Sequence, residues 1–430
     1  MLIGGPLERL FALEQFGIKL GLDNIRAILA ALGNPERAYR TIHIGGTNGK
    51  GSVAAMVERG LRAAGLKTGR YTSPHLDRIE ERVAIDGQTV DRETFASVAG
   101  EVLDVVESLS RRNPAEGRLA VPPTFFEVST AVAFEIFKRA AVDVAVVEVG
   151  LGGRFDATNV LTPTIAAITT IAFDHERHLG NTLEQIAFEK AGIAKPGVPL
   201  VIGRLPKEAA LRISEVAREV GASIFDAHAM AIDRFYPPLA LAGRHQVENA
   251  AVAVAILERW STLVSHVPAE AIVTGLTDCE WPARLEWLRL ASGELLIDAA
   301  HNPAGAAVLA SYLQDTGAER MPIVLAAMAD KDANGMIAAL APAASAFIAT
   351  TVPHARARSA DQLAAEIREQ LPSIPLESIE SPDEAVQCAF AHPAHRSLGG
   401  GGSRRAVACG SIYMIGPLRS RLLATGATRL

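Results

Sequence analysis

Short apolar runs alternate with amphipathic stretches along most of the 430-residue chain. The range 142–149 is almost continuously apolar, as in a strand covered on both faces, and 40–44 and 164–171 also have the pattern of strands. Helical spacing is found in five ranges: 51–64, 126–139, 183–194, 207–221 and 246–262. Strands and helices that alternate in this way predict βα units around a mainly parallel sheet.

A second alternating set begins after Trp281 and Pro282. Strands are expected at 294–297, 322–327 and 406–409, and helices at 304–316, 363–370 and 412–423. The pattern therefore predicts two domains, 1–282 and 283–430, of which the second is smaller and resembles a Rossmann fold. The glycine-rich run Gly399–Ser403, just before the expected strand 406–409, is expected to be a flexible loop.

Composition narrows the kinds of ligand and compartment. Apolar residues make up 49% and charged residues 21%, and the formal charge is −6, which argues against general affinity for nucleic acid or an anionic membrane. Cys279, Cys388 and Cys409 are too few and too far apart for a disulfide framework or a thiolate zinc site. The expected ligands are therefore small molecules.

Two stretches bear on localisation. Near the N-terminus, Glu8, Arg9, Glu14 and Lys19 interrupt any apolar run before a signal-peptide core could form. The uncharged stretch 333–355 contains Asn, Gly, Ser and two Pro residues, so it is expected to form a short helix and a buried strand and not a membrane span. A cytoplasmic protein is the expectation.

The strongest chemical signal is the loop after the first strand. It carries a glycine-rich run with one lysine and a following hydroxyl: Gly46, Thr47, Asn48, Gly49, Lys50, Gly51 and Ser52. A loop that links a buried strand to a helix directs free backbone N–H groups at one point and therefore binds phosphate, with Lys50 reaching the β and γ phosphates. The alternative is a glycine turn with an incidental lysine. This motif predicts a P-loop ATPase-like N-terminal domain.

The loop departs from the common phosphate-loop motif in two ways. Ile44 stands where the first glycine belongs, and Gly51 separates Lys50 from Ser52. These departures argue against the common GTPases and motor ATPases. They also shift the expected magnesium-binding hydroxyl to Ser52 or to another serine.

With this loop, nine further blocks make the chain resemble the Mur-ligase superfamily, and within it the folylpolyglutamate synthase/dihydrofolate synthase family. The resemblance extends from about Arg40 to Gly416. The matching blocks are Tyr71 to Leu76, Thr124 to Glu127, Glu148 to Asn159, Asp174 with His175, Glu189 to Ile193, His245 and Gln246 with Asn249 to Ala251, Asp298 to Pro303, Asp330 to Asp332, and Gly410 with Ser411. Ala283 and Ala299 stand where the family usually has glycine, but Arg284 and His301 remain in place.

The resemblance implies a metal and nucleotide site. Ser73, Glu148 and His175 would be magnesium ligands, and Lys190 would be carbamylated and help to position the metal. Residue types alone leave other readings open: a salt bridge for Glu148, a helix cap for His175 and a solvent-facing position for Lys190. The implied cofactors are ATP and Mg²⁺, with K⁺ as an additional candidate.

Further roles are implied for the nucleotide. Asn249 would hold the adenine side of ATP, Arg284 the γ-phosphate and Asp298 the ribose, with His301 beside them. The alternatives are a helix-cap cluster for Asn249 and an interdomain salt bridge for Arg284. Lys50, Lys190, His175, Arg284 and His301 form the implied catalytic set.

The implied pterin pocket is bordered by Phe125, Phe126, Asp156 and Ala157, where either phenylalanine could stack on a flat ring and Asp156 could hydrogen-bond to it. Ordinary core packing is the alternative for the aromatic residues.

The expected reaction is an ATP-dependent ligation. A carboxylate attacks the γ-phosphorus of ATP to give an acyl phosphate, and the amine of L-glutamate then displaces phosphate. Dihydropteroate and tetrahydrofolates are the leading acceptors, and a monomer is expected. Another Mur-type amino-acid ligase, a kinase or GTPase-like nucleotide switch and a nucleotide-binding scaffold without turnover are the alternatives.

Overall fold

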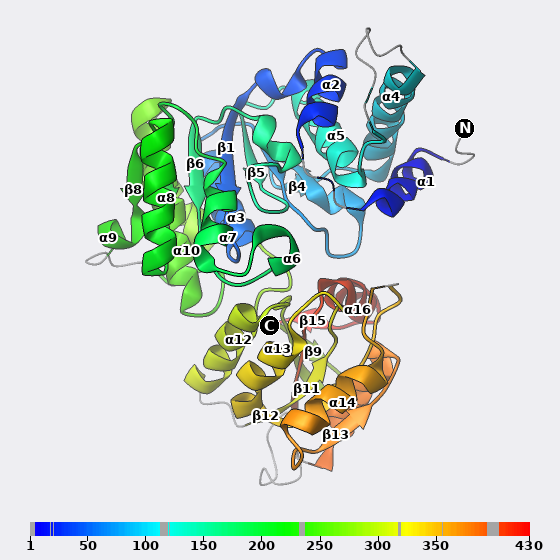
Figure 1. Cartoon of the computed structure of the whole chain (residues 1–430). Helices are drawn as coiled ribbons and strands as arrows, with labels where there is room; N and C mark the ends of the chain where they lie inside the picture. Colours follow the sequence, from blue (N-terminus) through cyan, green and yellow to red (C-terminus); the bar gives the residue numbers. More distant parts are fainter. Residues whose placement is uncertain are drawn as a thin grey trace. The chain divides into compact units, whose positions relative to one another are not determined.

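The computed structural model describes residues 5–17, 19, 21–111, 119, 121–231, 237–316, 320–354, 356–393 and 404–430. They form two compact units (Figure 1). The first holds the described residues of Met1–Ile171, His178–Ala240 and Val247–Cys279, and the second those of Ala172–Arg177, Leu241–Gln246 and Glu280–Leu430. Two short segments that precede Glu280 in the chain thus belong to the second unit. The domain division at 282 and 283 stays a prediction, and the expected loop Gly399–Ser403 lies outside the described residues.

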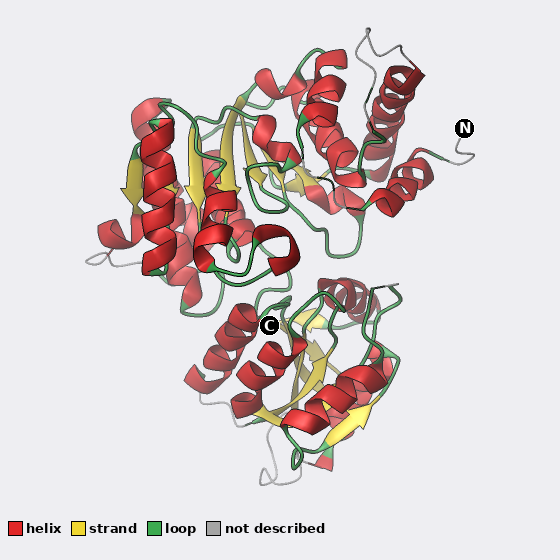
Figure 2. Cartoon of the chain, in the orientation of Figure 1, coloured by secondary structure: helices red, strands yellow, loops and turns green. Residues whose placement is uncertain are grey.

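The first unit is built on a mainly parallel sheet, with a short antiparallel edge, in the order β4-β3-β2-β5-β1-β6-β7-β8 (Figure 2). Its strands are β1 Arg40–Gly45, β2 Thr68–Tyr71, β3 Val83–Ile85, β4 Gln88–Thr89, β5 Val144–Glu148, β6 Ile165–Ile168, β7 Leu200–Ile202 and β8 Ile224–Asp226. The apolar strands β1, β5 and β6 are adjacent and parallel, as their composition predicts.

Helices cover both faces of this sheet. They are α1 Pro6–Phe11, α2 Asp23–Ala31, α3 Lys50–Ala63, α4 Arg92–Arg111, α5 Phe125–Arg139, α6 Glu176–Leu179, α7 Leu183–Ala191, α8 Lys207–Val220, α9 Ala227–Ala231, α10 His245–Leu263 and α11 Ala269–Thr277. A side chain at Gly69 would meet Phe137 of α5, whereas the next residue, Arg70, pairs with Glu58 of α3. Because successive side chains of a strand point to opposite faces, α5 and α3 lie on opposite faces.

The face that carries α5 also carries α7 and α8. In the sheet register His43 of β1 lies beside Val147 of β5 and Ala166 of β6. Val147 belongs to the core packed by α1, α2, α4 and α5, and Ala166 to the core packed by α7 and α8. His43 therefore lies between two apolar cores.

The second unit has a sheet in the order β13-β12-β11-β14-β10-β9-β15, in which β9 and β15 are antiparallel to their neighbours. The strands are β9 Glu286–Leu290, β10 Gly293–Ile297, β11 Met321–Leu325, β12 Ala344–Ala349, β13 Leu376–Ser378, β14 Arg405–Cys409 and β15 Thr428–Arg429. The helices are α12 Pro303–Asp315, α13 Ala333–Leu340, α14 Ala360–Gln370, α15 Pro382–Ala391 and α16 Ile412–Ala424. Side chains of α12, α13 and α14 pack one core against this sheet.

The expected α/β fold class with two mainly parallel sheets is confirmed. The uncharged stretch 333–355 contains α13 and the strand β12, and within the described residues no helix is long and apolar enough to cross a membrane. The short elements β2, β3, β4 and β9 had not been expected. Their few residues carry too little periodicity to be recognised in a single sequence.

Candidate active site

The phosphate loop lies at the carboxyl end of β1, at the centre of the first sheet, and leads directly into α3. Gly46 and Gly49 have φ angles of 135° and 85°, which favour glycine because they lie in the left-handed region. Lys50 is the first residue of α3, and its Nζ donates to the carbonyl oxygen of Thr47 at 3.1 Å. The lysine therefore curls back over the loop, where an anion bound at the helix N-terminus would meet it.

Two threonines at the end of the neighbouring strand hold the loop. Thr169 Oγ1 donates to the backbone oxygen of Asn48 at 2.6 Å, and the Thr170 hydroxyl accepts from the Asn48 N–H at 3.0 Å. The Thr170 carbonyl oxygen accepts from the N–H of Thr47 at 2.7 Å. A Cβ on Gly46 would lie 2.1 Å from Thr169 Oγ1, so this approach requires glycine. Thr169 and Thr170 had not been identified in the sequence.

Lys190 and Asn249 also contact the loop. Lys190 is only 5% exposed, and its Nζ donates to the carbonyl oxygen of Gly46 at 3.0 Å. A Cβ at Gly49 would lie 2.3 Å from Asn249 Oδ1, so this buried amide packs against the loop. The solvent-facing alternative for Lys190 is therefore wrong. The carbamylation of Lys190 and the adenine contact of Asn249 stay predictions.

Two of the three expected magnesium ligands lie together beside Lys50. Glu148 ends β5 and is 6% exposed, and its Oε2 accepts from the Ser73 N–H at 3.3 Å. Its Oε1 lies 3.8 Å from Lys50 Nζ. A hydroxyl and a carboxylate beside a phosphate loop provide the oxygen donors that Mg²⁺ prefers, so these residues fit the ion. The described residues contain no group of three His, Cys, Asp or Glu side chains that could hold a metal.

The third expected ligand, His175, belongs to the second unit. Its Nε2 lies 3.2 Å from Nζ of Lys331, which also donates to Asp174 Oδ1 at 2.6 Å. Lys331 is a donor only, so Nε2 is the acceptor and the proton of the neutral ring is on Nδ1. The role of His175 as a metal ligand stays a prediction, and its Nε2 is engaged with Lys331.

Asp174 organises this part of the second unit. Besides Lys331, it accepts from Asn302 Nδ2 at 3.1 Å, and its Oδ2 lies 3.7 Å from His301 Nε2. Burial raises the pKa of Asp174, but the nearby His301 and the charge of Lys331 outweigh burial and hold the pKa well below its usual range. Asp174 and Lys331 lie in blocks that the sequence marked as matching the family, but neither had been assigned a role.

The other expected residues of the second unit are gathered around the end of β10. Asp298 is buried and accepts from the N–H groups of Leu285 and Ala300, each at 2.8 Å. Burial raises the pKa of Asp298, and the nearby Arg284 opposes this shift. Nδ1 of His301 lies 2.9 Å from the carbonyl oxygen of Ala299, which can only accept, so Nδ1 carries a proton. The structure thus brings Arg284, Asp298 and His301 together.

Three of the expected pterin residues, Phe125, Phe126 and Ala157, pack in the same apolar core as Tyr71. The Phe126 ring lies 6.3 Å from the Tyr71 ring and is partly exposed, whereas Phe125 is buried and stacks on Phe11 at 5.7 Å. Phe126 is therefore the more accessible ring for a flat ligand, and Phe125 fits its core alternative. Ala157 is buried in the same core.

Asp156 is fully engaged within the protein. Its Oδ1 accepts from the Thr158 N–H at 3.0 Å and from the Thr158 hydroxyl, and its Oδ2 accepts from the Leu151 N–H at 2.7 Å. Thr158 Oγ1 in turn lies 2.8 Å from Nε2 of the buried His43. Burial raises the pKa of Asp156, although these hydrogen bonds oppose the shift. A direct hydrogen bond from Asp156 to a pterin stays a prediction, and the contacts show that this carboxylate orders its own loop.

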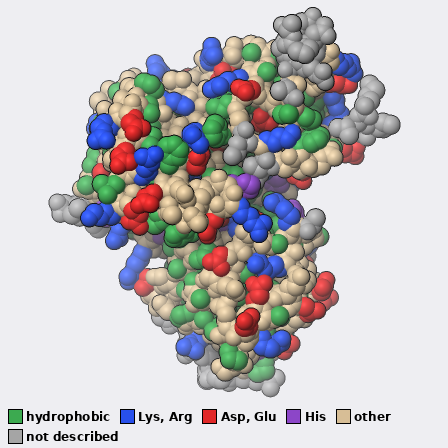
Figure 3. All heavy atoms as spheres, in the orientation of Figure 1, with side chains coloured by type: hydrophobic (Ala, Val, Ile, Leu, Met, Phe, Trp, Pro, Cys, Tyr) green, Lys and Arg blue, Asp and Glu red, His purple; other side chains and the backbone are tan. Residues whose placement is uncertain are grey.

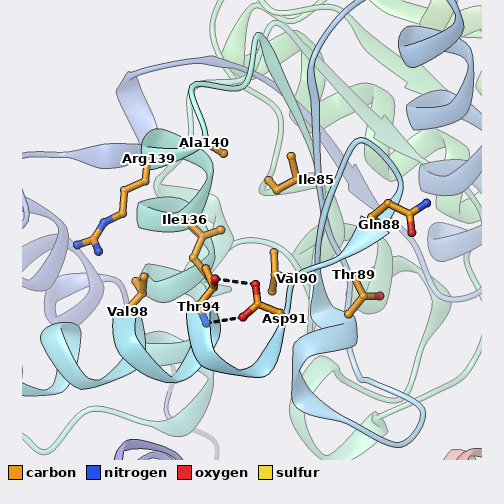
Figure 4. A pocket seen from close by; sticks show the side chains of 10 residues that line it. All are labelled: Ile85, Gln88, Thr89, Val90, Asp91, Thr94, Val98, Ile136, Arg139 and Ala140. Atoms are coloured by element: carbon orange, nitrogen blue, oxygen red, sulfur yellow. Dashed lines mark hydrogen bonds between the residues drawn. The ribbon is translucent and has the colours of Figure 1, made fainter.

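A groove of about 480 Å³ lies elsewhere in the first unit (Figure 4). It is lined by Ile85, Gln88, Thr89, Val90, Asp91, Thr94, Val98, Ile136, Arg139 and Ala140. Asp91 accepts from the backbone and hydroxyl of Thr94, and Arg139 pairs with Glu101 and Glu135. None of the expected site residues lines it. Its two charged residues, Asp91 and Arg139, already have partners within the protein, so it is not a candidate active site.

Charges of both signs are interspersed among the described residues on the face drawn in Figure 3. Neither sign gathers there into a broad patch of the kind that attracts nucleic acid.

Known proteins resemble this chain over nearly its whole length. Residues 283–397 match the family model of the Mur ligase, glutamate ligase domain. A dihydrofolate synthase/folylpolyglutamate synthase of Bacillus subtilis is 32% identical, over 95% of this chain and 96% of the relative. Mycobacterium tuberculosis folylpolyglutamate synthase complexed with ADP superposes with a TM-score of 0.87 at 33% identity, over 97% of this chain and 98% of that one. Escherichia coli FolC in complex with DHPP and ADP superposes with a TM-score of 0.83 at 28% identity, over 98% of this chain and 99% of that one.

The phosphate loop, the carboxylate at the end of β5 and the two α/β units agree with this similarity. The chain belongs to the dihydrofolate synthase/folylpolyglutamate synthase family of Mur ligases, which are ATP-dependent ligases.

Proposed function

We propose that the protein joins L-glutamate to the carboxylate of dihydropteroate, of a tetrahydrofolate, or of both, through an acyl phosphate. The observation that carries the proposal is the placement of Lys50, Glu148 and Ser73 at one end of a preordered phosphate loop. The similarity to proteins complexed with ADP, and with DHPP and ADP, supports these ligands for this chain.

The reaction divides into two displacements. In the first, an oxygen of the acceptor carboxylate attacks the γ-phosphorus, the bond from phosphorus to the β,γ-bridging oxygen breaks, and ADP leaves. In the second, the glutamate amine attacks the acyl carbon, the carbon–oxygen bond to phosphate breaks, and the amine loses a proton. The phosphate loop and Lys50 hold the phosphates, and Ser73 and Glu148 would hold a divalent ion. That ion would neutralise charge on the phosphates.

Arg284, Asp298 and His301 are proposed to act on the nucleotide, with Arg284 on the γ-phosphate and Asp298 on the ribose. Asp298 already orders the segment that carries Arg284 by accepting from the Leu285 N–H. A fixed cation at the γ-phosphate stabilises the charge that moves during phosphoryl transfer. We also propose that the enzyme acts in the cytoplasm as a monomer.

Carbamylation of Lys190 belongs to the same proposal. A carbamate keeps one N–H on Nζ, so the hydrogen bond to Gly46 would survive while the cation becomes an anion. With ¹³C-bicarbonate, the wild type would give a carbamate signal in ¹³C NMR that Lys190→Met lacks. The same spectrum in both proteins would refute the modification.

An isotope experiment tests the ligase reaction. Dihydropteroate or tetrahydrofolate labelled with ¹⁸O in its carboxylate is mixed with ATP, Mg²⁺ and L-glutamate, and the released phosphate is analysed by mass spectrometry. An acyl phosphate transfers one labelled oxygen to phosphate, whereas a nucleotide switch that uses water transfers none. Comparing the two acceptors shows which of them the enzyme uses.

Lys50→Met should abolish the release of labelled phosphate, because it removes the cation at the phosphates of ATP. The control is Lys67→Met, because Lys67 is exposed and lies outside the site. Phosphate release without label, or without dependence on any acceptor, would contradict the proposal.

A further inference from the structure

Arg82 is a largely buried cation with no carboxylate at ion-pair distance among the described residues. It is 7% exposed and lies at the end of the short helix η3, Ile79–Arg82. By contrast, Arg70 on the neighbouring strand has Glu58 within 3.6 Å. A buried charge without a counter-charge is unfavourable, so an anionic ligand would stabilise the Arg82 guanidinium.

The geometry of Arg82 leaves donors available. Its Nε donates to His75 Nδ1 at 3.0 Å, while Nη1 and Nη2 make no hydrogen bond within the described residues and are not sealed from solvent. Because His75 Nδ1 is the acceptor, the proton of this ring is on Nε2. The pair offers one fixed cation and several N–H donors.

Arg82 borders the aromatic side of the candidate site. Its guanidinium carbon lies 5.0 Å from the centroid of the Phe125 ring. Burial raises the pKa of Tyr71, and the charge of Arg82 opposes this shift. The Tyr71 ring packs near Phe126. The cation is therefore near the rings that would hold a pterin or its benzoyl group.

The same pair is joined through the chain to the phosphate side. His75 is two residues beyond Ser73, whose N–H donates to Glu148, and Glu148 lies beside Lys50. A carboxylate in reach of Arg82 and His75 would thus be attached to a ligand on the aromatic side and face the phosphate loop.

We propose that Arg82 and His75 bind the carboxylate of the acceptor, the group that is phosphorylated in the first step. This inference rests on the proposed function and adds a binding site for an aryl carboxylate or a γ-carboxylate. A guanidinium holds a carboxylate in a fixed plane through two parallel N–H groups, which orients one oxygen for attack.

The test compares two ligands on several proteins. The ligands are dihydropteroate and the analogue in which hydrogen replaces the carboxylate, and their dissociation constants are measured by calorimetry with the full chain and a non-hydrolysable ATP analogue. Wild type should prefer the carboxylate ligand by about 10- to 100-fold, the range for charge-assisted hydrogen bonds. On the same reasoning, Arg82→Gln should reduce this preference to less than about threefold, mainly by lowering the affinity for the carboxylate ligand.

Arg78→Gln is the matched control, because Arg78 is exposed and adjoins the same short helix. It should keep the wild-type preference. Arg82→Lys keeps the positive charge but loses the two parallel N–H groups of the guanidinium. It should therefore give an intermediate preference for the carboxylate ligand, and it keeps the test decisive where Arg82→Gln fails to fold. Equal weakening of both ligands by Arg82→Gln or Arg82→Lys would assign Arg82 a packing role and overturn the inference, as would a wild type that does not distinguish the ligands.

The phosphate-release assay with wild type separates the two proposals. Turnover with dihydropteroate, together with an Arg82 variant that keeps the full preference, would overturn the role of Arg82 and leave the ligase reaction intact. Absence of turnover with every pteroate and folate would overturn the proposed function itself, and the Arg82 assignment with it.

Discussion

Lys190 of α7 donates a hydrogen bond of 3.0 Å from Nζ to the carbonyl oxygen of Gly46, the first residue of the phosphate loop. Lys190→Met keeps most of the buried stem but leaves this carbonyl without the lysine as donor. The loop should then be less well ordered, and affinity for a non-hydrolysable ATP analogue should fall about 10-fold, the effect of one charge-assisted hydrogen bond. Titration calorimetry measures the affinity.

Lys207→Met is the control for this change. Lys207 is exposed at the start of α8, so its substitution should leave the nucleotide affinity unchanged. Unchanged nucleotide affinity in Lys190→Met would show that the loop holds its shape without the lysine.

Thr169→Val removes one hydroxyl and keeps the shape of the side chain. The hydroxyl bonds to the Asn48 carbonyl oxygen at 2.6 Å, so its loss should loosen the phosphate loop before ATP binds. KM for ATP should rise roughly five- to tenfold, while kcat changes little, because the lost hydrogen bond orders the free loop. Steady-state kinetics at saturating acceptor measure both constants. Thr169→Ser restores the hydroxyl and should restore KM, and a fall in kcat alone would contradict this account.

The elements that the sequence predicted well are those with strong periodicity. The run 142–149 became the central strand β5, and the helical pattern of 126–139 became α5, whose start is fixed by a capping box between Thr124 and Glu127. Such features depend only on residues that are close together in the sequence, so they can be recognised in a single sequence. The short strands β2 and β3 depend on their neighbours in the sheet and were missed.

The residues of the candidate site also fall into two groups, those that local sequence predicts and those that depend on distant partners. The phosphate loop is contiguous in sequence, and Gly46 to Ser52 could be identified from residue types and order. Thr169, Asp174 and Arg82 act across 43 or more positions: Thr169 bonds to Asn48, Asp174 to Lys331, and Arg82 lies against Phe125. Such partners follow from the topology of the sheets and not from spacing along the chain, so the sequence alone left these three without roles.

Asp174→Asn tests the buried pair of the second unit. Asp174 and Lys331 have side chains that are 8% and 10% exposed, and their atoms approach to 2.6 Å. Removing the carboxylate charge leaves a buried ammonium without its partner, which should lower the free energy of unfolding by on the order of 3 kcal/mol. Urea unfolding measures the loss.

Asp330→Asn, at an exposed position, should stay within about 0.5 kcal/mol of wild type. The double variant Asp174→Asn with Lys331→Met should recover part of the loss, because no unpaired ammonium remains. Equal losses in Asp174→Asn and Asp330→Asn would contradict the importance of the pair.

The lowered pKa of His43 predicts how the stability of the first unit depends on pH. Burial, with a smaller contribution from the charge of Lys195, lowers the pKa of His43 from 6.5 to about 3. Between these values the unfolded chain binds a proton that the folded chain does not, so this residue makes the free energy of unfolding fall as pH decreases from about 6.5 towards 3. One proton contributes on the order of 1.4 kcal/mol per pH unit. His43→Gln keeps an amide to bond with Thr158 and does not titrate. Its urea-unfolding free energy should fall less steeply than that of wild type between pH 6.5 and 5, and identical slopes would show that His43 does not remain neutral in the folded state.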